Sequence, residues 1–165
     1  MAENVERVKK YLADFGLAEK VRAFNDVSTA TVPLAALAIG CEEAQIAKSL
    51  SFYGKADQAI IIVATGDAKV DNGKFKKQFE TKPKMLKGED VERLTSYPIG
   101  GVCPFALPLE AEVYLDVSMK RFSMMYPAAG NAASAVDLTL EELERASKTK
   151  GWVDVCKGWQ KEESI

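Results

Sequence analysis

Residues 48–66 of this chain read KSLSFYGKADQAIIIVATG and contain two strand-like runs in succession. The second run, QAIIIVATG (58–66), is an almost unbroken apolar stretch, which is typical of a strand covered on both faces of a sheet. The first run, KSLSFYG (48–54), is strand-like as well. We therefore expect both runs to lie at the centre of a sheet.

Helical and strand-like segments are interspersed on either side of these two runs. Thr31 and Gly40 bracket one apolar helix as its cap and stop, and Thr139 with Glu142 forms a capping box for another. Helices are predicted in residues 4–17, 31–40, 42–47, 71–79, 88–94 and 139–143, and further strands in 21–26, 112–118, 122–126 and 151–156. Without a long linker or a repeat, the sequence predicts a single α+β or mixed α/β domain over residues 1–165.

The composition is that of an ordinary globular protein, with 47% apolar and 28% charged residues. No apolar run reaches the length of a membrane span, and the start MAENVERVKK lacks the apolar stretch of a signal peptide. We therefore expect a cytoplasmic protein that does not enter a membrane. The net charge of −2 argues against a protein that binds nucleic acid with its whole surface.

The absence of histidine limits the chemistry further. With none in 165 residues, Ser-His-Asp and Cys-His catalytic arrangements are excluded. The cysteines, Cys41, Cys103 and Cys156, are widely spaced and offer no zinc-binding pattern, so we expect reduced, buried side chains and no metal. Any catalysis has to rely on lysine, carboxylates, backbone amides or groups of the substrate.

Lys48 stands where the helical pattern of residues 42–47 gives way to the strand. Its neighbours Ile46, Ala47 and Leu50 are apolar, so the ammonium is carried toward an interior. Either the side chain extends back to water along an apolar surface, or the charge has a function.

Residues 67–87 are rich in lysine, with seven lysines against three acids. Such a segment is able to contact phosphates while the rest of the molecule stays acidic, and the alternative is a solvated helix face. A loop with the sequence YPIGGVCPFALPL (97–109) follows, in which paired glycines precede two prolines. This loop is either a tight turn or a rigid support that directs peptide N–H groups at an oxyanion.

The segments STATVPLAALAIGCEEAQIAKSLSFYG, TGDAKVDNGKFKK, YPIGGVCPFALP and EVYLDVS resemble, in this order, the YbaK/prolyl-tRNA-synthetase-associated domain family. The similarity runs from about Val27 to Asp116, and more loosely to Val155. It implies a single α+β domain with a mixed, mostly antiparallel, curved central sheet and flanking helices. It also implies an editing enzyme without a cofactor that hydrolyses mischarged aminoacyl-tRNA.

The resemblance also implies site residues. Lys48 is expected to contact the 3′-terminal adenosine and the aminoacyl ester. The GxxxP loop, Gly100 to Pro104, is expected to place the N–H groups of Gly101 and Val102 near the ester carbonyl, with a bound water and the ribose 2′-OH completing the chemistry. Residues expected to bind the substrate are Ser28, Thr29, Ser49, Pro104, Asp116 and Gly130, and those expected to bind tRNA phosphates are Lys74, Lys76 and Lys77.

Several alternatives stay open at this point. Thr31 serves as a helix cap or as a pocket residue, and Asp116 serves the site or closes a strand. Cys103 lies inside the loop, but without a neighbouring base we interpret it as packing. The segment YPAAGNAASAV (126–136) departs from the SAGRRG-like version of relatives that act on cysteinyl-tRNA, so the amino acid removed is not fixed.

Three functions are compatible with these observations. The first is a deacylase that acts in trans on the 3′ CCA end of tRNA, with tRNA for proline carrying cysteine or alanine as the expected substrate and prolyl-tRNA synthetase as a possible partner. The second is a non-catalytic module that binds tRNA or a synthetase. The third is a protein that binds a small amino-acid-like or nucleotide ligand. Intact Lys48 and the GxxxP loop favour the deacylase.

Overall fold

The structure is a computed structural model, and it describes residues 2–160. The α-helices are α1 (Ala2–Ala13), α2 (Val32–Ile39), α3 (Asn72–Phe79), α4 (Gly88–Thr95) and α5 (Leu140–Ser147), and the 3₁₀ helices are η1 (Ala18–Lys20), η2 (Glu43–Gln45) and η3 (Val117–Arg121). The strands are β1 (Val21–Ala23), β2 (Ile46–Tyr53), β3 (Ala59–Thr65), β4 (Lys69–Val70), β5 (Glu112–Asp116), β6 (Met124–Pro127), β7 (Ser134–Val136), β8 (Leu138–Thr139), β9 (Gly151–Val153) and β10 (Cys156–Lys157).

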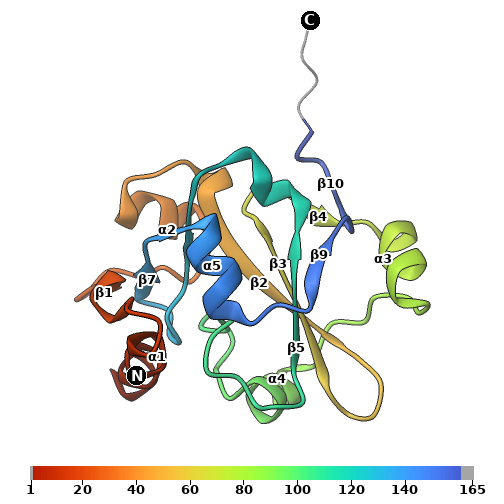
Figure 1. The fold of residues 1–165 in the computed structure, drawn as a ribbon, viewed down its shortest axis with the longest axis horizontal. Coiled ribbons are helices and arrows are strands. Elements are labelled where there is room, and N and C mark those ends of the chain that lie inside the picture. Colours follow the sequence, from red (N-terminus) through yellow and green to blue (C-terminus); the bar gives the residue numbers. More distant parts are fainter. Residues whose placement is uncertain (1, 161–165) are drawn as a thin grey trace, which may run out of the picture.

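A six-stranded mixed sheet with the order β8-β6-β2-β3-β5-β9 forms the centre of the molecule (Figure 1). The pairs β1-β7 and β4-β10 form two small separate sheets. Four of the seven pairings are antiparallel, and the three parallel ones, β2-β6, β3-β5 and β5-β9, all lie in the large sheet. The α+β class and the mixed, curved sheet expected from the sequence are confirmed. The expectation that the central sheet is mostly antiparallel is wrong, because three of its five pairings in residues 2–160 are parallel and join strands that are far apart in the sequence.

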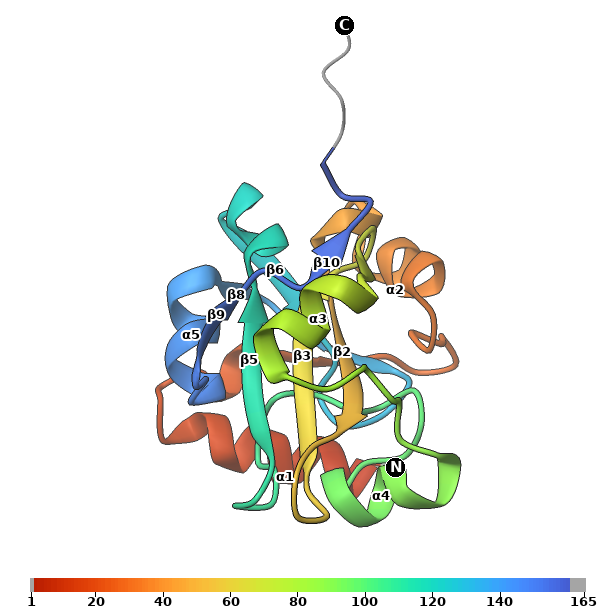
Figure 2. The same ribbon diagram turned by 90° about the vertical axis from the view of Figure 1, so that its right-hand side faces the viewer.

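The strand β3 is covered on both faces, as its apolar sequence predicted. All seven of its residues are buried. Ile61 and Val63 belong to the core cluster that contains Val8 of α1, whereas Ile62 belongs to the cluster that contains Phe75 of α3. Figure 2 shows α3 in front of the sheet and α1 behind it. The central position of β2 and β3 is therefore confirmed.

The helix caps read from the sequence are present. Thr31 accepts a hydrogen bond from the N–H of Leu34 at 3.3 Å, and Gly40 ends α2 in the left-handed region at φ +84°. Thr139 and Glu142 form their reciprocal capping box at the start of α5, with distances of 3.0 and 3.1 Å. These local signals fix where α2 and α5 begin.

The helix predicted over residues 42–47 is wrong in its length. Only Glu43–Gln45 form a single 3₁₀ turn, closed by a hydrogen bond of 3.2 Å from the N–H of Glu42 to the side chain of Gln45. The strand begins immediately afterwards, because Ile46 and Ala47 pair with β6. Lys48 therefore lies inside β2 and not at a helix end.

Candidate functional site

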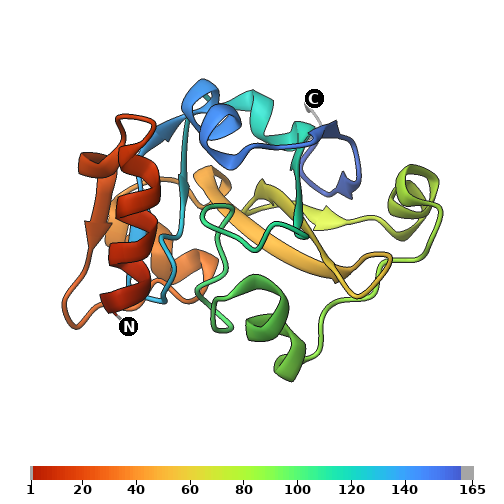
Figure 3. The same ribbon diagram turned by 60° about the horizontal axis from the view of Figure 1, so that its bottom comes forward.

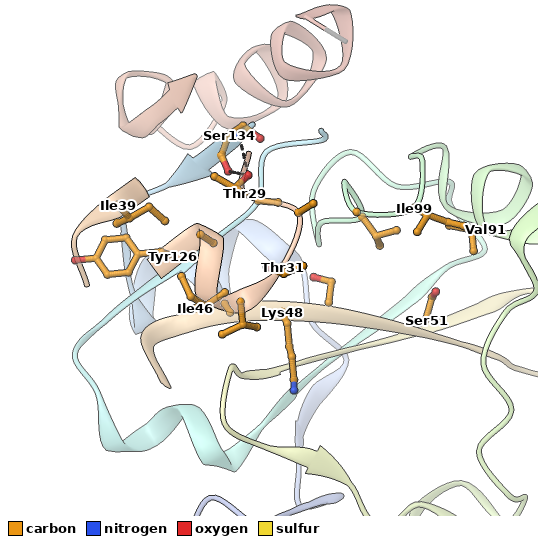
Figure 4. Close-up of a pocket in the computed structure, with 18 of the residues that line it drawn as sticks. Thr29, Thr31, Ile39, Ile46, Lys48, Ser51, Val91, Ile99, Tyr126 and Ser134 are labelled. Atoms are coloured by element: carbon orange, nitrogen blue, oxygen red, sulfur yellow. Dashed lines mark hydrogen bonds between the residues drawn. The ribbon is translucent and has the colours of Figure 1, made fainter. Parts of the chain in front are cut away.

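A cavity of about 300 Å³ lies between α2, β2 and the loop that contains Gly100 (Figure 4). Its apolar wall consists of Val32, Ala35, Ile39, Ile46 and Tyr126, and its polar lining residues are Thr29, Thr31, Lys48, Ser49, Ser51 and Ser134. Figure 3 shows α2 and α4 on the same side of the sheet. A cavity of this size suits a small ligand.

Thr29 is fixed at the cavity by the backbone of β7. Its hydroxyl donates to the carbonyl of Ser134 at 3.3 Å and accepts from the N–H of Ser134 at 3.1 Å, as the dashed lines in Figure 4 show. The side chain is 8% exposed. Thr29 thus lines the cavity, as expected, but its hydroxyl mainly joins two segments far apart in the sequence. Thr31 both caps α2 and lines the cavity.

Ser49 has an unusual position among the polar residues of the cavity. Its hydroxyl oxygen is buried and has no hydrogen-bond partner within residues 2–160. Leaving a buried hydroxyl without a partner costs on the order of 1–3 kcal/mol. A cavity with such a group at its wall is suited to a ligand that forms a hydrogen bond with the Ser49 hydroxyl.

Figure 4 shows the side chain of Lys48 pointing away from Thr31. Successive side chains of a strand face opposite sides of the sheet, so Lys48 and its neighbour Ser49 lie on opposite faces of β2. Its ammonium donates to the carbonyl of Ala68 and lies 3.4 Å from the carbonyl of Gly66. Burial lowers the pKa of this lysine. The ammonium is thus engaged inside the protein, and contact with a substrate requires that it leave these carbonyls.

The turn held by Lys48 supports the cavity wall. A Cβ at Gly66 would lie 2.1 Å from the carbonyl oxygen of Glu43 and 2.7 Å from a methyl carbon of Val32, so the turn packs tightly beside α2. Asp67 in the same turn pairs with Arg121 at 2.7 Å. Burial would raise the pKa of Asp67, but hydrogen bonds from Arg121 and Thr65 outweigh it and hold the pKa below its ordinary value.

The GxxxP loop contributes Gly100 and Val102 to the cavity. Within residues 2–160 neither of their N–H groups has a hydrogen-bond acceptor, whereas the N–H of Gly101 donates to the carbonyl of Pro98 at 3.0 Å. Gly100 adopts φ +88°, which glycine tolerates without strain. The two residues that flank Gly101 thus line the cavity and have N–H groups without an acceptor in residues 2–160, whereas the N–H of Gly101 itself is used by the turn.

Gly101 is required for a different reason from the one expected. A Cβ at this position would lie 2.7 Å from the Cα of Asn131 and 2.8 Å from the carbonyl oxygen of Gly130. The space beside Gly101 is therefore filled by backbone and does not accommodate an ester carbonyl. The close approach fixes the loop against residues 130–131.

Four of the expected substrate-binding residues lie outside the cavity lining. Ser28 is exposed, and its hydroxyl accepts from the N–H of Ala30 at 3.1 Å. Pro104 lines a separate hollow. Asp116 is 0% exposed and accepts from the N–H groups of Ser118 and Val155, both at 2.9 Å, so it closes the end of β5. These placements give the three residues structural roles.

Gly130, the fourth, packs behind the loop. At φ +102°, a Cβ there would meet Asn4 and Tyr97 at 3.1 Å. The cavity instead includes Ser51, Tyr126 and Ser134, which no sequence pattern singled out.

The expected tRNA-binding lysines lie on α3, on the opposite face of the sheet. Lys74 donates to Asp154 at 3.1 Å and to the carbonyl of Cys156 at 3.0 Å, so its charge is already paired. Lys76 and Lys77 are exposed. Only these two of the three present free charges.

The cysteines do not provide a nucleophile. Cys103 is 0% exposed, and burial raises the pKa of its thiol to about 11. Cys41 and Cys156 also have raised pKa values, in both cases mainly through burial. In the part of the chain that the structure describes, no cluster of His, Cys, Asp or Glu has the size to hold a metal ion, and no helix is long and apolar enough to cross a membrane.

Comparison with known proteins identifies the family. Residues 26–146 match the model of the aminoacyl-tRNA editing domain. The chain belongs to this family. The cavity, with Thr29, Lys48 and Gly100 at its walls, lies within the matched range.

Three relatives place the chain within the family. It is 46% identical over 157 residues to the uncharacterized protein YwhH of Bacillus subtilis, covering 95% of this chain and 99% of the relative. It is 27% identical over 106 residues to the "putative Cys-tRNA(Pro)/Cys-tRNA(Cys) deacylase EbsC" of Enterococcus faecalis, covering 64% and 65% of the two chains. It also superposes with a TM-score of 0.85 and 28% identity on the crystal structure of "a putative trans-editing enzyme for prolyl tRNA synthetase", covering 96% and 99%.

Proposed function

We propose that this protein is a trans-acting deacylase that hydrolyses the ester of mischarged tRNA in the cytoplasm. The observation that carries the proposal is the cavity of about 300 Å³, which is lined by Gly100 and Val102, whose N–H groups have no acceptor within residues 2–160, and by Ser49, whose buried hydroxyl has no partner there. Membership in the editing-domain family supports the same chemistry. The aminoacyl ester at the 3′ end of charged tRNA has a carbonyl oxygen that is able to accept hydrogen bonds from such N–H groups.

In the proposed reaction, the N–H groups of Gly100 and Val102 donate to the ester carbonyl oxygen. A water molecule adds to the carbonyl carbon, and the negative charge that develops on the oxygen is stabilised by these donors. The bond to the ribose 3′-oxygen then breaks, and the proton lost by the water passes through the 2′-OH to this leaving oxygen. Because the ester is already activated, the absence of histidine is compatible with this path.

Ser49 and Thr29 contact the amino acid in this proposal. The Ser49 hydroxyl, which has no partner within residues 2–160, forms a hydrogen bond with the amino acid, and Thr29 positions the wall formed with β7. Lys48 is assigned a positioning part, because its ammonium holds the Gly66–Ala68 turn behind Val32. Exposed Lys76 and Lys77 contact tRNA phosphates outside the cavity.

The proposed substrate is tRNA for proline carrying an amino acid smaller than proline, such as alanine or cysteine, and prolyl-tRNA synthetase is the proposed partner. A cavity discriminates most sharply by excluding side chains that are too large. The test incubates the full chain with tRNA for proline that carries alanine, cysteine, serine or proline. It measures the rate at which each amino acid is released. Hydrolysis of at least one misacylated tRNA with prolyl-tRNA spared supports the proposal, and binding without release from any of them refutes it.

A further inference from the structure

A second hollow, of about 860 Å³, lies at the C-terminal end of β2, beside Tyr53, and shares no lining residue with the cavity. It is bounded by the turn after β2, by residues 78–84 and by the first residues of β5. The mechanism proposed above makes no use of it. Its volume is larger than that of the cavity.

A short segment connects the two hollows. Residues 82–87, which we call the strap, run beside the end of β2, where the N–H of Tyr53 donates to the carbonyl of Lys84 at 2.9 Å and the N–H of Leu86 donates to the carbonyl of Ser51 at 3.1 Å. Met85 of the strap lines the cavity and is 57% exposed, whereas Lys84 lines the second hollow. Neighbouring residues of the strap therefore line the two hollows, so an extended ligand that reaches both has to cross the strap.

Aromatic rings from three different elements line this hollow. Tyr53 comes from β2, Phe79 from α3 and Tyr114 from β5, and all three are half-buried. The rings of Phe79 and Tyr114 contact each other edge to face, with centroids 5.0 Å apart. Half-exposed rings fixed by neighbours are the surfaces on which unpaired bases stack.

The charges of the hollow favour a polyanion. Lys55, Lys82 and Lys84 line it, are exposed, and form no salt bridge within residues 2–160. Of the two acids in the lining, Glu112 accepts a hydrogen bond from Tyr114 at 2.8 Å, and Glu80 is exposed. The lysines thus outnumber the acids, and the ammonium of Lys84 lies over the Tyr53 ring, 5.7 Å from its centroid, so a lysine and a ring stand together in the lining.

Two acids near the hollow share one arginine, which offsets one of their two negative charges. Asp57 and Asp90 both pair with Arg93, each at 2.8 Å. Free lysines beside aromatic rings, with the neighbouring carboxylates paired, are the combination that binds single-stranded nucleic acid.

We propose that the second hollow binds the unpaired nucleotides that precede the 3′-terminal nucleotide of the tRNA. Lys82 and Lys84 contact their phosphates as the strand crosses the strap, and the rings of the hollow stack with their bases. This inference rests on the proposed function, because it takes the terminal nucleotide to occupy the cavity. It adds a second site, on the far side of the strap, that holds the tRNA independently of the amino acid.

The test measures the affinity of the full chain for uncharged tRNA with an intact CCA end over a series of salt concentrations. Lys82→Gln combined with Lys84→Gln is compared with Lys9→Gln combined with Lys10→Gln, two exposed lysines on α1. Since each phosphate contact to a single strand contributes about 0.7 to the salt slope, we expect the slope to fall by about 1.4 in the first variant and to stay unchanged in the second. Equal slopes in the two variants overturn the inference.

A second probe distinguishes the single strand from the helical stem. With tRNA that lacks the CCA nucleotides, the strap variant and wild type should bind with the same salt slope, and a persisting difference overturns the assignment to unpaired nucleotides. The binding measurement requires no hydrolysis, so its outcome is separate from that of the deacylation assay. A chain that binds as expected but releases no amino acid refutes the deacylase alone, whereas a deacylase with an unchanged strap variant refutes this site alone.

Discussion

Replacing Gly101 by alanine tests the close approach that fixes the GxxxP loop. The added methyl carbon would lie 2.7 Å from the Cα of Asn131, 2.8 Å from the oxygen of Gly130 and 3.0 Å from the nitrogen of Asn131. These atoms belong to the backbone, so no side-chain rotation relieves the overlap and one segment has to move. Overpacking of this kind costs about 1–3 kcal/mol, from which about 0.4–1 kcal/mol is offset by the stiffer unfolded chain.

We therefore expect Gly101→Ala to lower the free energy of unfolding by about 1.3 kcal/mol, and by about 2.5 kcal/mol at most. Urea denaturation followed by circular dichroism measures this as a midpoint lower by on the order of 1 M. Gly88→Ala is the matched control, because its nearest neighbour would be the terminal carbon of Ile99 at 3.7 Å, an ordinary contact. The control should keep or raise the midpoint, and a Gly101→Ala midpoint equal to that of wild type would refute the close approach.

The same variant affects activity through the neighbouring donors. Movement of the loop displaces the N–H groups of Gly100 and Val102, and a shift of about 1 Å in catalytic groups typically costs on the order of 10² in rate. Single-turnover deacylation, corrected for the folded fraction, should fall accordingly. Full activity per folded molecule would remove the loop from the proposed reaction.

Three further changes test the surroundings of the cavity. Lys48→Met keeps the apolar stem of the side chain but loses the hydrogen bonds to the Gly66–Ala68 turn, so the free energy of unfolding should fall by about 1.5–3 kcal/mol. An unchanged denaturation midpoint would instead favour the direct substrate contact expected from the sequence. Ser49→Ala removes the buried hydroxyl without a partner, so it should raise stability by about 1 kcal/mol while slowing deacylation, and reduced stability with full activity would contradict its assignment. Because the pKa of Asp67 is held below its ordinary value of 3.8, its contribution to stability is present above pH 3.8 and is lost as the pH falls through the lower pKa of the folded state. Asp67→Asn should therefore flatten the dependence of stability on pH below about pH 4. Identical acid unfolding of the variant and the wild type would refute this.

The sequence predicted the elements whose signals are local. The apolar run of β3 and the caps of α2 and α5 depend on residues within one or two turns of each other, and these elements lie where expected. The strand β7 was missed, because Ser134–Val136 is too short to show a period and exists only by pairing with β1. The helix over residues 42–47 was overestimated because pairing with β6 extends β2 back to Ile46.

The candidate site was predicted in part for the same reason. Glycines at 100 and 101 signalled a special loop, but only the tertiary structure reveals that Gly101 faces the backbone of residues 130–131. Likewise, the hydrogen bonds between Thr29 and Ser134 join residues that no local pattern relates. The side of β2 toward which Lys48 points depends on the strand register, which the mistaken helix end concealed.

The order of the strands has a consequence for the time course of folding. β2 and β3 are joined by a short turn and are able to pair within microseconds, whereas the partners of Ile60 in β5 and of Ile46 in β6 arrive much later along the chain. During synthesis the hairpin therefore precedes the rest of the sheet. A nascent chain halted before Ser134 leaves the ribosome would display the β2-β3 hairpin but would lack the partner of Thr29, and with it one wall of the cavity.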